Sequence, residues 1–187
     1  LFPNFVFLDT PFNQHELWRA DDPKRYLHEI ATMGCRTRVF ENVCGPKTSV
    51  GRGNLSFTTM NLPRLAIEAS QRELPTAPVE QQQERARVLF LESVREMATF
   101  IGDQLHERYL YQRSALARQF PFMMGNDVWK GGAALAPQDE VGSVFDSGTL
   151  GIGFIGGHNA MMALYGEGHG RSDRSWQTLY DAVQVIN

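Results

Sequence analysis

The sequence is poor in cysteine, in net charge and in long apolar runs. Its two cysteines, Cys35 and Cys44, are too few for a disulfide scaffold or a four-cysteine zinc site. A formal net charge of −3 provides no basic surface for nucleic acid. No apolar run approaches the roughly 18 residues that span a membrane, and no secretory signal is visible. These absences predict a cytoplasmic protein with free thiols that binds neither nucleic acid nor a membrane.

The usual signatures of metal sites and serine hydrolases are missing as well. The 5 histidines show neither HxxxH nor HExxH spacing, so we expect no metal site. No Gly-x-Ser-x-Gly elbow occurs. The segment Gly151–Gly156 matches GxGxxG, but Ile152, Phe154 and Ile155 make it typical of a strand. No second strand with an acidic end follows at the distance that NAD binding requires, so we disfavour that function.

The residues that are present predict a globular segment with alternating strands and helices. At 42% hydrophobic and 21% charged, the chain can bury a core. It opens at Leu1 within an expected strand, which suggests a segment of a longer protein. Expected strands cover 1–9, 55–60, 120–124 and 147–155; expected helices cover 23–32, 62–68, 79–118, 159–165 and 173–186. This alternation predicts the α/β class.

Two helices carry clear apolar periodicity, which we interpret as core packing and not as chemistry. Over 79–118 the stripe consists of Val88, Leu91, Val94, Ala98, Ile101, Leu105 and Tyr109. Over 173–186 the residues expected to point inward are Trp176, Leu179, Tyr180, Val183 and Ile186.

Cys35 is the residue most suggestive of chemistry. It lies between Gly34 and Arg36, with Arg38 nearby. Glycine permits a tight turn, and the two arginines favour a thiolate. A loop of this kind presents sulfur to a substrate, whereas an inert, half-buried cysteine is the alternative. We assign Cys44 no role.

Several blocks of sequence occur in an order that resembles one known family. They lie at 2–9, 33–38, 51–54, 61–66, 148–156 and 168–170. In this order they resemble the anaerobic (class III) ribonucleoside-triphosphate reductases, which are glycyl-radical enzymes. The resemblance covers essentially the whole chain, and the ordered set is far more specific than any single block.

The resemblance implies a fold and a reaction. The fold would be the second half of a ten-stranded α/β barrel, with 1–187 forming part of a single catalytic domain. An inserted finger loop at about 33–53 would carry Cys35, whose thiyl radical takes the 3′ hydrogen of the ribonucleotide. Asn54 would orient the substrate sugar, and Asn61 is a second candidate for substrate contact. Without the resemblance, either asparagine could be a turn or helix-cap residue.

The resemblance also implies a site for the substrate phosphates. The turn after the strand at 147–155 faces the nucleotide in this family, so Gly156, Gly157, His158 and Asn159 are candidates for phosphate binding. Free backbone N–H groups at a helix start would suit an anion. Many relatives read Gly-Leu-Ala-Glu here, whereas this chain reads Gly-His-Asn-Ala, so the expected role belongs to the backbone. His158 could instead cap the helix or lie in the interior.

The remaining implications concern groups outside the chain. The radical would reside on a glycine beyond it, with formate as reductant, and the family's zinc site and ATP or dNTP effector sites would also lie elsewhere. The expected partners are a ribonucleoside triphosphate, a radical-SAM activase with an iron–sulfur cluster, and a second copy in a homodimer. We expect the chain alone to be inactive. Alternatives are a glycyl-radical enzyme of the pyruvate formate-lyase type, which typically has adjacent cysteines in this loop, and a truncated, non-catalytic nucleotide-binding copy.

Overall fold

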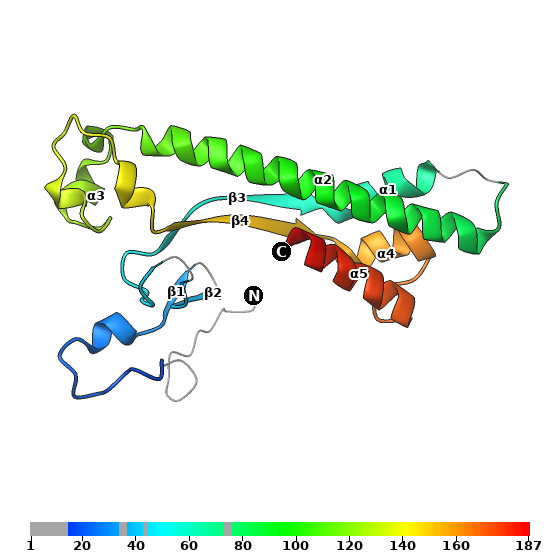
Figure 1. Cartoon of the computed structure of the whole chain (residues 1–187), viewed down its shortest axis with the longest axis horizontal. Coiled ribbons are helices and arrows are strands. Elements are labelled where there is room, and N and C mark those ends of the chain that lie inside the picture. The colour runs from blue at the N-terminus through cyan, green and yellow to red at the C-terminus, as the bar shows by residue number, and fades with distance from the viewer. Residues whose placement is uncertain (1–14, 34–36, 43–44, 73–75) are drawn as a thin grey trace, which may run out of the picture. The chain divides into compact units, whose positions relative to one another are not determined.

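The computed structural model describes residues 15–33, 37–42, 45–72 and 76–187 (Figure 1). The chain divides into two compact units. The first unit combines Leu1–Leu55 with Tyr109–Thr149, and the second combines Ser56–Arg108 with Leu150–Asn187. Across the described ranges, no helix has both the length and the apolar character needed to cross a membrane.

The central pair of strands confirms the α/β class. Strands β3 (Gly53–Asn61) and β4 (Gly148–Ile155) are neighbours in a two-stranded sheet and run parallel (Figure 1). A helix follows each strand: α1 (Leu62–Gln71) begins immediately after β3, and α4 (Gly157–Tyr165) begins one residue after β4. The starts of both helices therefore lie at the carboxyl ends of the strands. The strands expected at 55–60 and 147–155 correspond to β3 and β4.

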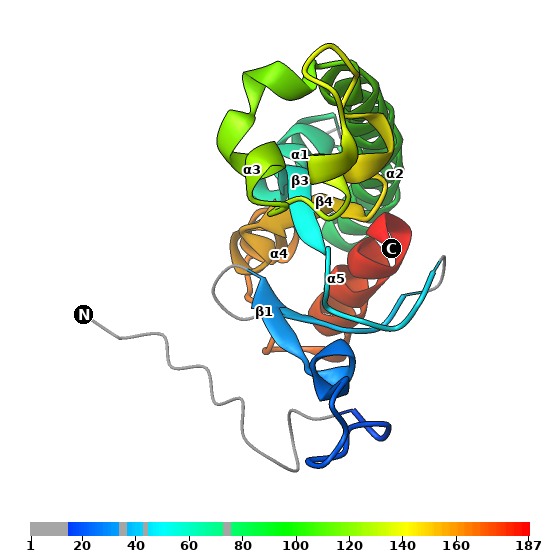
Figure 2. The ribbon, with the colours of Figure 1, turned by 90° about the vertical axis from the view of Figure 1, so that its left-hand side faces the viewer.

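The core of the second unit forms between this sheet and its helices. Helix α2 (Val79–Arg113) buries Phe90, Val94 and Leu105, each at most 2% exposed. Met60 of β3 joins the same cluster. Helix α4 packs against both α1 and α5 (Asp173–Ile186), as Figures 1 and 2 show. The helical period of the apolar residues accounts for most of this burial.

Two details of the expected packing are wrong. On α2, Val88 is 45% exposed and the inward position belongs to Phe90. On α5, Trp176 and Tyr180 are 56% and 48% exposed. The residues that α5 buries are instead small: Ser175, Thr178 and Ala182. Small side chains let α5 approach its neighbours closely, which leaves no room for aromatic rings on that face.

The beginning of the described chain differs from the helix expected over 23–32. A 3₁₀ turn occupies Arg25–His28, and β1 (Ala31–Met33) follows. Strand β1 pairs antiparallel with β2 (Thr37–Val39). The turn buries none of its residues, so no tertiary packing supports a longer helix.

The rest of the first unit is built from short helical pieces. These are the 3₁₀ helices Ala117–Gln119, Gly132–Ala134 and Gly142–Phe145, and the helix α3 (Pro121–Gly125). The strand expected over 120–124 is therefore wrong. Pro121 lacks the N–H that a strand ladder needs, whereas its fixed φ suits a first helical turn. A small core of Ala117, Met124, Val141 and Phe145 holds these pieces together.

Candidate functional site

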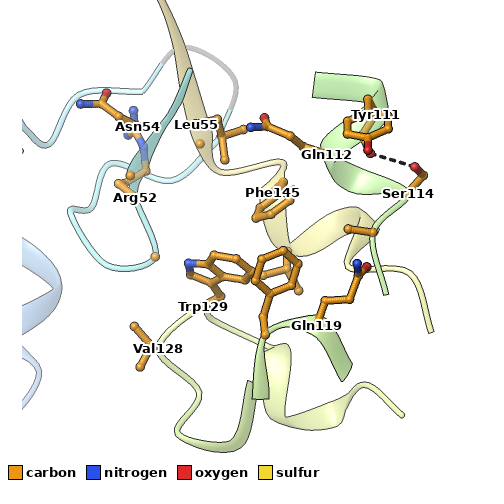
Figure 3. A pocket seen from close by; sticks show the side chains of 16 residues that line it. Arg52, Asn54, Leu55, Tyr111, Gln112, Ser114, Gln119, Val128, Trp129 and Phe145 are labelled. Carbon is orange, nitrogen blue, oxygen red and sulfur yellow. Dashed lines mark hydrogen bonds between the residues drawn. The ribbon is translucent and has the colours of Figure 1, made fainter. Parts of the chain in front are cut away.

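The first unit contains a cavity of about 800 Å³ (Figure 3). Its walls come from the start of β3, the end of α2 and the segment between residues 114 and 148. The residues that line it are Gly51, Arg52, Gly53, Asn54, Leu55, Tyr111, Gln112, Ser114, Ala115, Gln119, Phe120, Val128, Trp129, Val144, Phe145 and Gly148. A volume of this size lies within the range of ligand-binding clefts, roughly 300–1,000 Å³.

Three aromatic rings form one wall of the cavity. The Trp129 ring lies 4.9 Å from that of Phe120 and 4.8 Å from that of Phe145, measured between centroids. Both arrangements are inclined, which the ring quadrupoles favour over a parallel sandwich. Phe145 is only 7% exposed and anchors the wall in the small core. The wall is therefore a fixed apolar surface.

The polar groups of the lining are few. Among the described residues of the lining, Arg52 alone is charged, and its guanidinium donates to the Glu41 carbonyl at 3.2 Å. Gln119 accepts from the Leu116 N–H at 2.7 Å. Gln112 reaches from α2 toward Leu55 (Figure 3), and no group of the described residues donates a hydrogen bond to its buried Oε1. An unsatisfied buried acceptor is unusual in a native fold.

Two hydrogen bonds connect the end of α2 with the segment that contains Phe145. The Tyr109 hydroxyl donates to Asp146 Oδ1 at 2.5 Å, and Arg113 donates to the Tyr109 oxygen at 2.9 Å. The hydrogen bond to Asp146 raises the pKa of Tyr109, because it stabilises the protonated phenol. This contact holds two walls of the cavity together.

A second feature lies in the second unit, where two helix starts meet. Gly156 precedes α4 with φ +73°, and a Cβ on it would overlap the Pro63 ring at the start of α1. The first intrahelical bond of α4 runs from the Ala160 N–H to the Gly156 carbonyl at 2.9 Å. The N–H groups of the preceding three residues therefore have no intrahelical acceptor. In parallel α/β sheets, ligands bind at this carboxyl edge.

Comparison with known proteins decides the family. The family model described as anaerobic ribonucleoside-triphosphate reductase matches residues 1–187. The chain belongs to this family. A curated relative from Salmonella typhimurium, named anaerobic ribonucleoside-triphosphate reductase, is 29% identical over 157 residues, which is 82% of this chain. Relatives of the same name from Escherichia coli and Haemophilus influenzae are 29% and 27% identical over 73% and 74% of it. The chain spans 18% of the length of each relative.

Cys35 was expected to act as the radical cysteine of this reductase family. It lies outside the described residues, and so does Cys44. The strands on either side of Cys35 are described. They pair antiparallel, with Met33 opposite Thr37.

Asn54 lies in the lining of the cavity, although its amide points away from the aromatic wall (Figure 3). The Thr149 hydroxyl lies 2.8 Å from Asn54 Oδ1 and 3.2 Å from the Gly53 carbonyl. The Asn54 side chain is exposed to solvent, and Thr149 contacts its Oδ1. Its predicted role in orienting a sugar stays a prediction.

The remaining predicted residues belong to the second unit. Asn61 caps α1, accepting from the Arg64 N–H at 3.2 Å, which is the structural alternative foreseen for it. Pro63 brings this cap next to Gly156, so the predicted Asn61 and Gly156 lie at one edge. His158 and Asn159 are exposed, and the His158 ring meets the His169 ring at 5.7 Å.

Sequence reasoning missed the cavity residues Arg52, Gln112 and Trp129. Trp129 stood in a glycine-rich segment without periodicity, and Gln112 resembled the polar face of a long helix. No local signal marks either one, because the cavity arises only when distant segments pack. Within the described ranges, no three His, Cys, Asp or Glu side chains gather as a metal ion would require.

Proposed function

We propose that this chain is part of the catalytic barrel of an enzyme that reduces ribonucleoside triphosphates to 2′-deoxyribonucleotides. The family match over residues 1–187 carries this proposal. The parallel β3–β4 pair, with a helix after each strand, is compatible with half of a ten-stranded α/β barrel. In the proposed arrangement, 1–187 belongs to one catalytic domain and about 33–53 forms the finger loop.

The paired helix starts of α1 and α4 would bind the substrate phosphates. The N–H groups of Gly157, His158 and Asn159 are unused within α4, and the helix dipole favours an anion there. Gly156 gives the turn its left-handed conformation. Asn61 already uses its Oδ1 as a cap, so its Nδ2 is the group that would donate to the substrate.

Cys35 and Asn54 would act on the ribose. Removing an unactivated carbon-bound hydrogen is beyond acid–base chemistry, and a sulfur radical can do it. The Cys35 thiyl would form an S–H bond as the C3′–H bond breaks, which leaves the unpaired electron on C3′. Thr149 occupies Asn54 Oδ1, so Nδ2 would donate to a ribose hydroxyl.

The proposal includes groups that this chain does not contain. The radical would be stored on a glycine elsewhere in the protein and generated by a radical-SAM activase with an iron–sulfur cluster. Formate would supply the electrons, and the full protein would work as a homodimer with zinc and effector sites outside this segment. The 187-residue chain alone would not turn over.

The decisive experiment replaces each cysteine by serine in the full-length gene product, activated under anaerobic conditions. We expect Cys35→Ser to abolish deoxynucleotide formation without lowering the melting temperature, since serine cannot carry the radical. Cys44→Ser is the matched control and should retain activity. Substantial turnover by Cys35→Ser would show that another residue takes the hydrogen.

A further inference from the structure

We propose that His15 is a positioning residue, which stacks on Phe40 and so anchors the pair of strands, β1 and β2, that flanks Cys35 in the sequence. The inference rests on the proposed function for the role of Cys35, and on the contacts of the first unit for the anchor itself. A sulfur radical takes a hydrogen atom only from a carbon that it meets at close range, so the strands on either side of it must hold their place.

The β1–β2 pair is too short to keep its place alone. Each strand has 3 residues, and the register begins with Ala31 opposite Val39 (Figure 1). Two strands by themselves are at best marginally stable in water, so the pair needs packing from outside. Val39 and the following Phe40 are 7% and 5% exposed, and the Ser49 hydroxyl donates to the Glu29 carbonyl at 2.7 Å. These contacts all lie at the end of the pair where β1 begins and β2 ends.

His15 provides a flat partner for Phe40 at this end. The centroids of the two rings lie 4.1 Å apart, with 25° between the ring planes, which is a stacked arrangement. The His15 side chain is only 11% exposed. The Leu17 N–H donates to its Nδ1 at 3.1 Å, which fixes how the imidazole is turned. The stack removes one face of each ring from water and therefore favours a single position for the end of β2.

Charged groups connect the same end to later residues of the proposed finger loop. Because His15 Nδ1 accepts a hydrogen bond, the neutral ring carries its proton on Nε2, which lies 3.8 Å from Glu41 Oε1. The other Glu41 oxygen pairs with Lys47 Nζ at 2.9 Å, and Arg52 donates to the Glu41 carbonyl at 3.2 Å. The Glu41 and Lys47 side chains are more than half exposed, so their pair contributes little. The buried stack of His15 on Phe40 is therefore the main anchor.

The experiment compares His15→Ala with His15→Phe in the activated full-length protein. Alanine removes the stack, whereas phenylalanine preserves it. We expect His15→Ala to lower kcat for CTP by up to about a hundredfold at unchanged KM, because a displacement of about 1 Å at the reacting atoms can cost this much. His15→Phe should restore most of the loss. The matched control is Tyr26→Ala, which removes a 53% exposed ring from the same unit and should leave kcat unchanged.

Two results would overturn the positioning role. One is wild-type kcat in a folded His15→Ala protein. The other is a melting temperature that falls in both His15 variants together with kcat, which would assign His15 to general stability.

Alkylation of thiols separates this inference from the proposed function, because it requires neither the radical nor turnover. Iodoacetamide labels the unactivated full-length protein, and mass spectrometry follows the peptide that contains Cys35. We expect several-fold faster labelling in His15→Ala than in wild type, and the wild-type rate in His15→Phe. This result in a protein that reduces no ribonucleotide would support the anchor and contradict the function. Equal labelling rates in an active reductase would contradict the anchor alone.

Discussion

At the residue scale, Gly156 shows how tightly a single position can be specified. Its φ of +73° lies in the left-handed region, and Pro63 occupies the space that a Cβ would need. Either reason alone favours glycine, and together they fix how β4 turns into α4. The sequence pattern GxGxxG marks this turn; taken alone it would suggest NAD binding, which the strand character of its residues disfavours.

Gly156→Ala should therefore destabilise the fold by at least about 1–2 kcal/mol, the cost of a left-handed non-glycine residue. The matched control is Gly102→Ala in α2, where a Cβ would meet nothing within 4 Å. Alanine there should stabilise the helix by up to about 1 kcal/mol. Urea unfolding monitored by circular dichroism measures both. Equal stability of Gly156→Ala and wild type would contradict the turn described here.

The sequence could suggest Asn54 as a candidate site residue, but not that Gln112 and Trp129 line the same cavity. Asn54 follows a glycine-spaced block that resembles a family motif, so its neighbours along the chain identify it. Gln112 becomes distinctive only in the fold, where it lines one cavity with residues from β3 and from the segment around Trp129. Burial without a hydrogen-bond partner is a tertiary property, and no local pattern encodes it.

At the element scale, strands and helices with one clear period were predictable and the short ones were not. Strand β3 was predicted from an imperfect alternation of apolar and polar residues over 55–60, and helix α1 begins after Asn61, which caps it. Helix α3 is only 5 residues long, too short to show a period, and Pro121 was the better signal. On α5 the large aromatic residues suggested the buried face, but close packing selected small side chains.

The contact between α4 and α5 includes a buried pair of hydroxyl groups. Tyr165 and Thr178 lie 2.9 Å apart through their hydroxyl oxygens, and Thr178 is fully buried. Thr178→Val keeps the shape and removes the partner of the Tyr165 hydroxyl, so we expect a loss of about 1–3 kcal/mol. Tyr165→Phe in the same background should recover part of it. Thermal unfolding tests this, and a variant as stable as wild type would mean that water satisfies Tyr165.

At the scale of the whole molecule, the second unit is assembled from two separate stretches of chain. Arg87 from one stretch donates to Asp181 of the other at 2.7 Å. Hydrogen bonds from Gln177 and Arg87 lower the pKa of Asp181 below its ordinary value of 3.8. The carboxylate therefore stabilises the fold above this value, and the contribution disappears as the pH falls through the lowered pKa.

Asp181→Asn should cost up to about 1 kcal/mol at pH 7, because both side chains are partly exposed. The difference from wild type should shrink as the pH falls below about 3.8, the ordinary pKa of the group. Denaturant midpoints at pH 7 and pH 3 provide the measurement, with the exposed Asp103→Asn as control. A difference that is the same at both pH values would mean that charge plays no part.

The boundaries between the two units fall inside regular elements. The chain passes from one unit to the other within β3, within α2 and within β4, after Leu55, Arg108 and Thr149. A recombination breakpoint anywhere between residues 56 and 149 would leave both units incomplete. We therefore expect a chimaera of two related genes to fold best when this whole stretch comes from one parent.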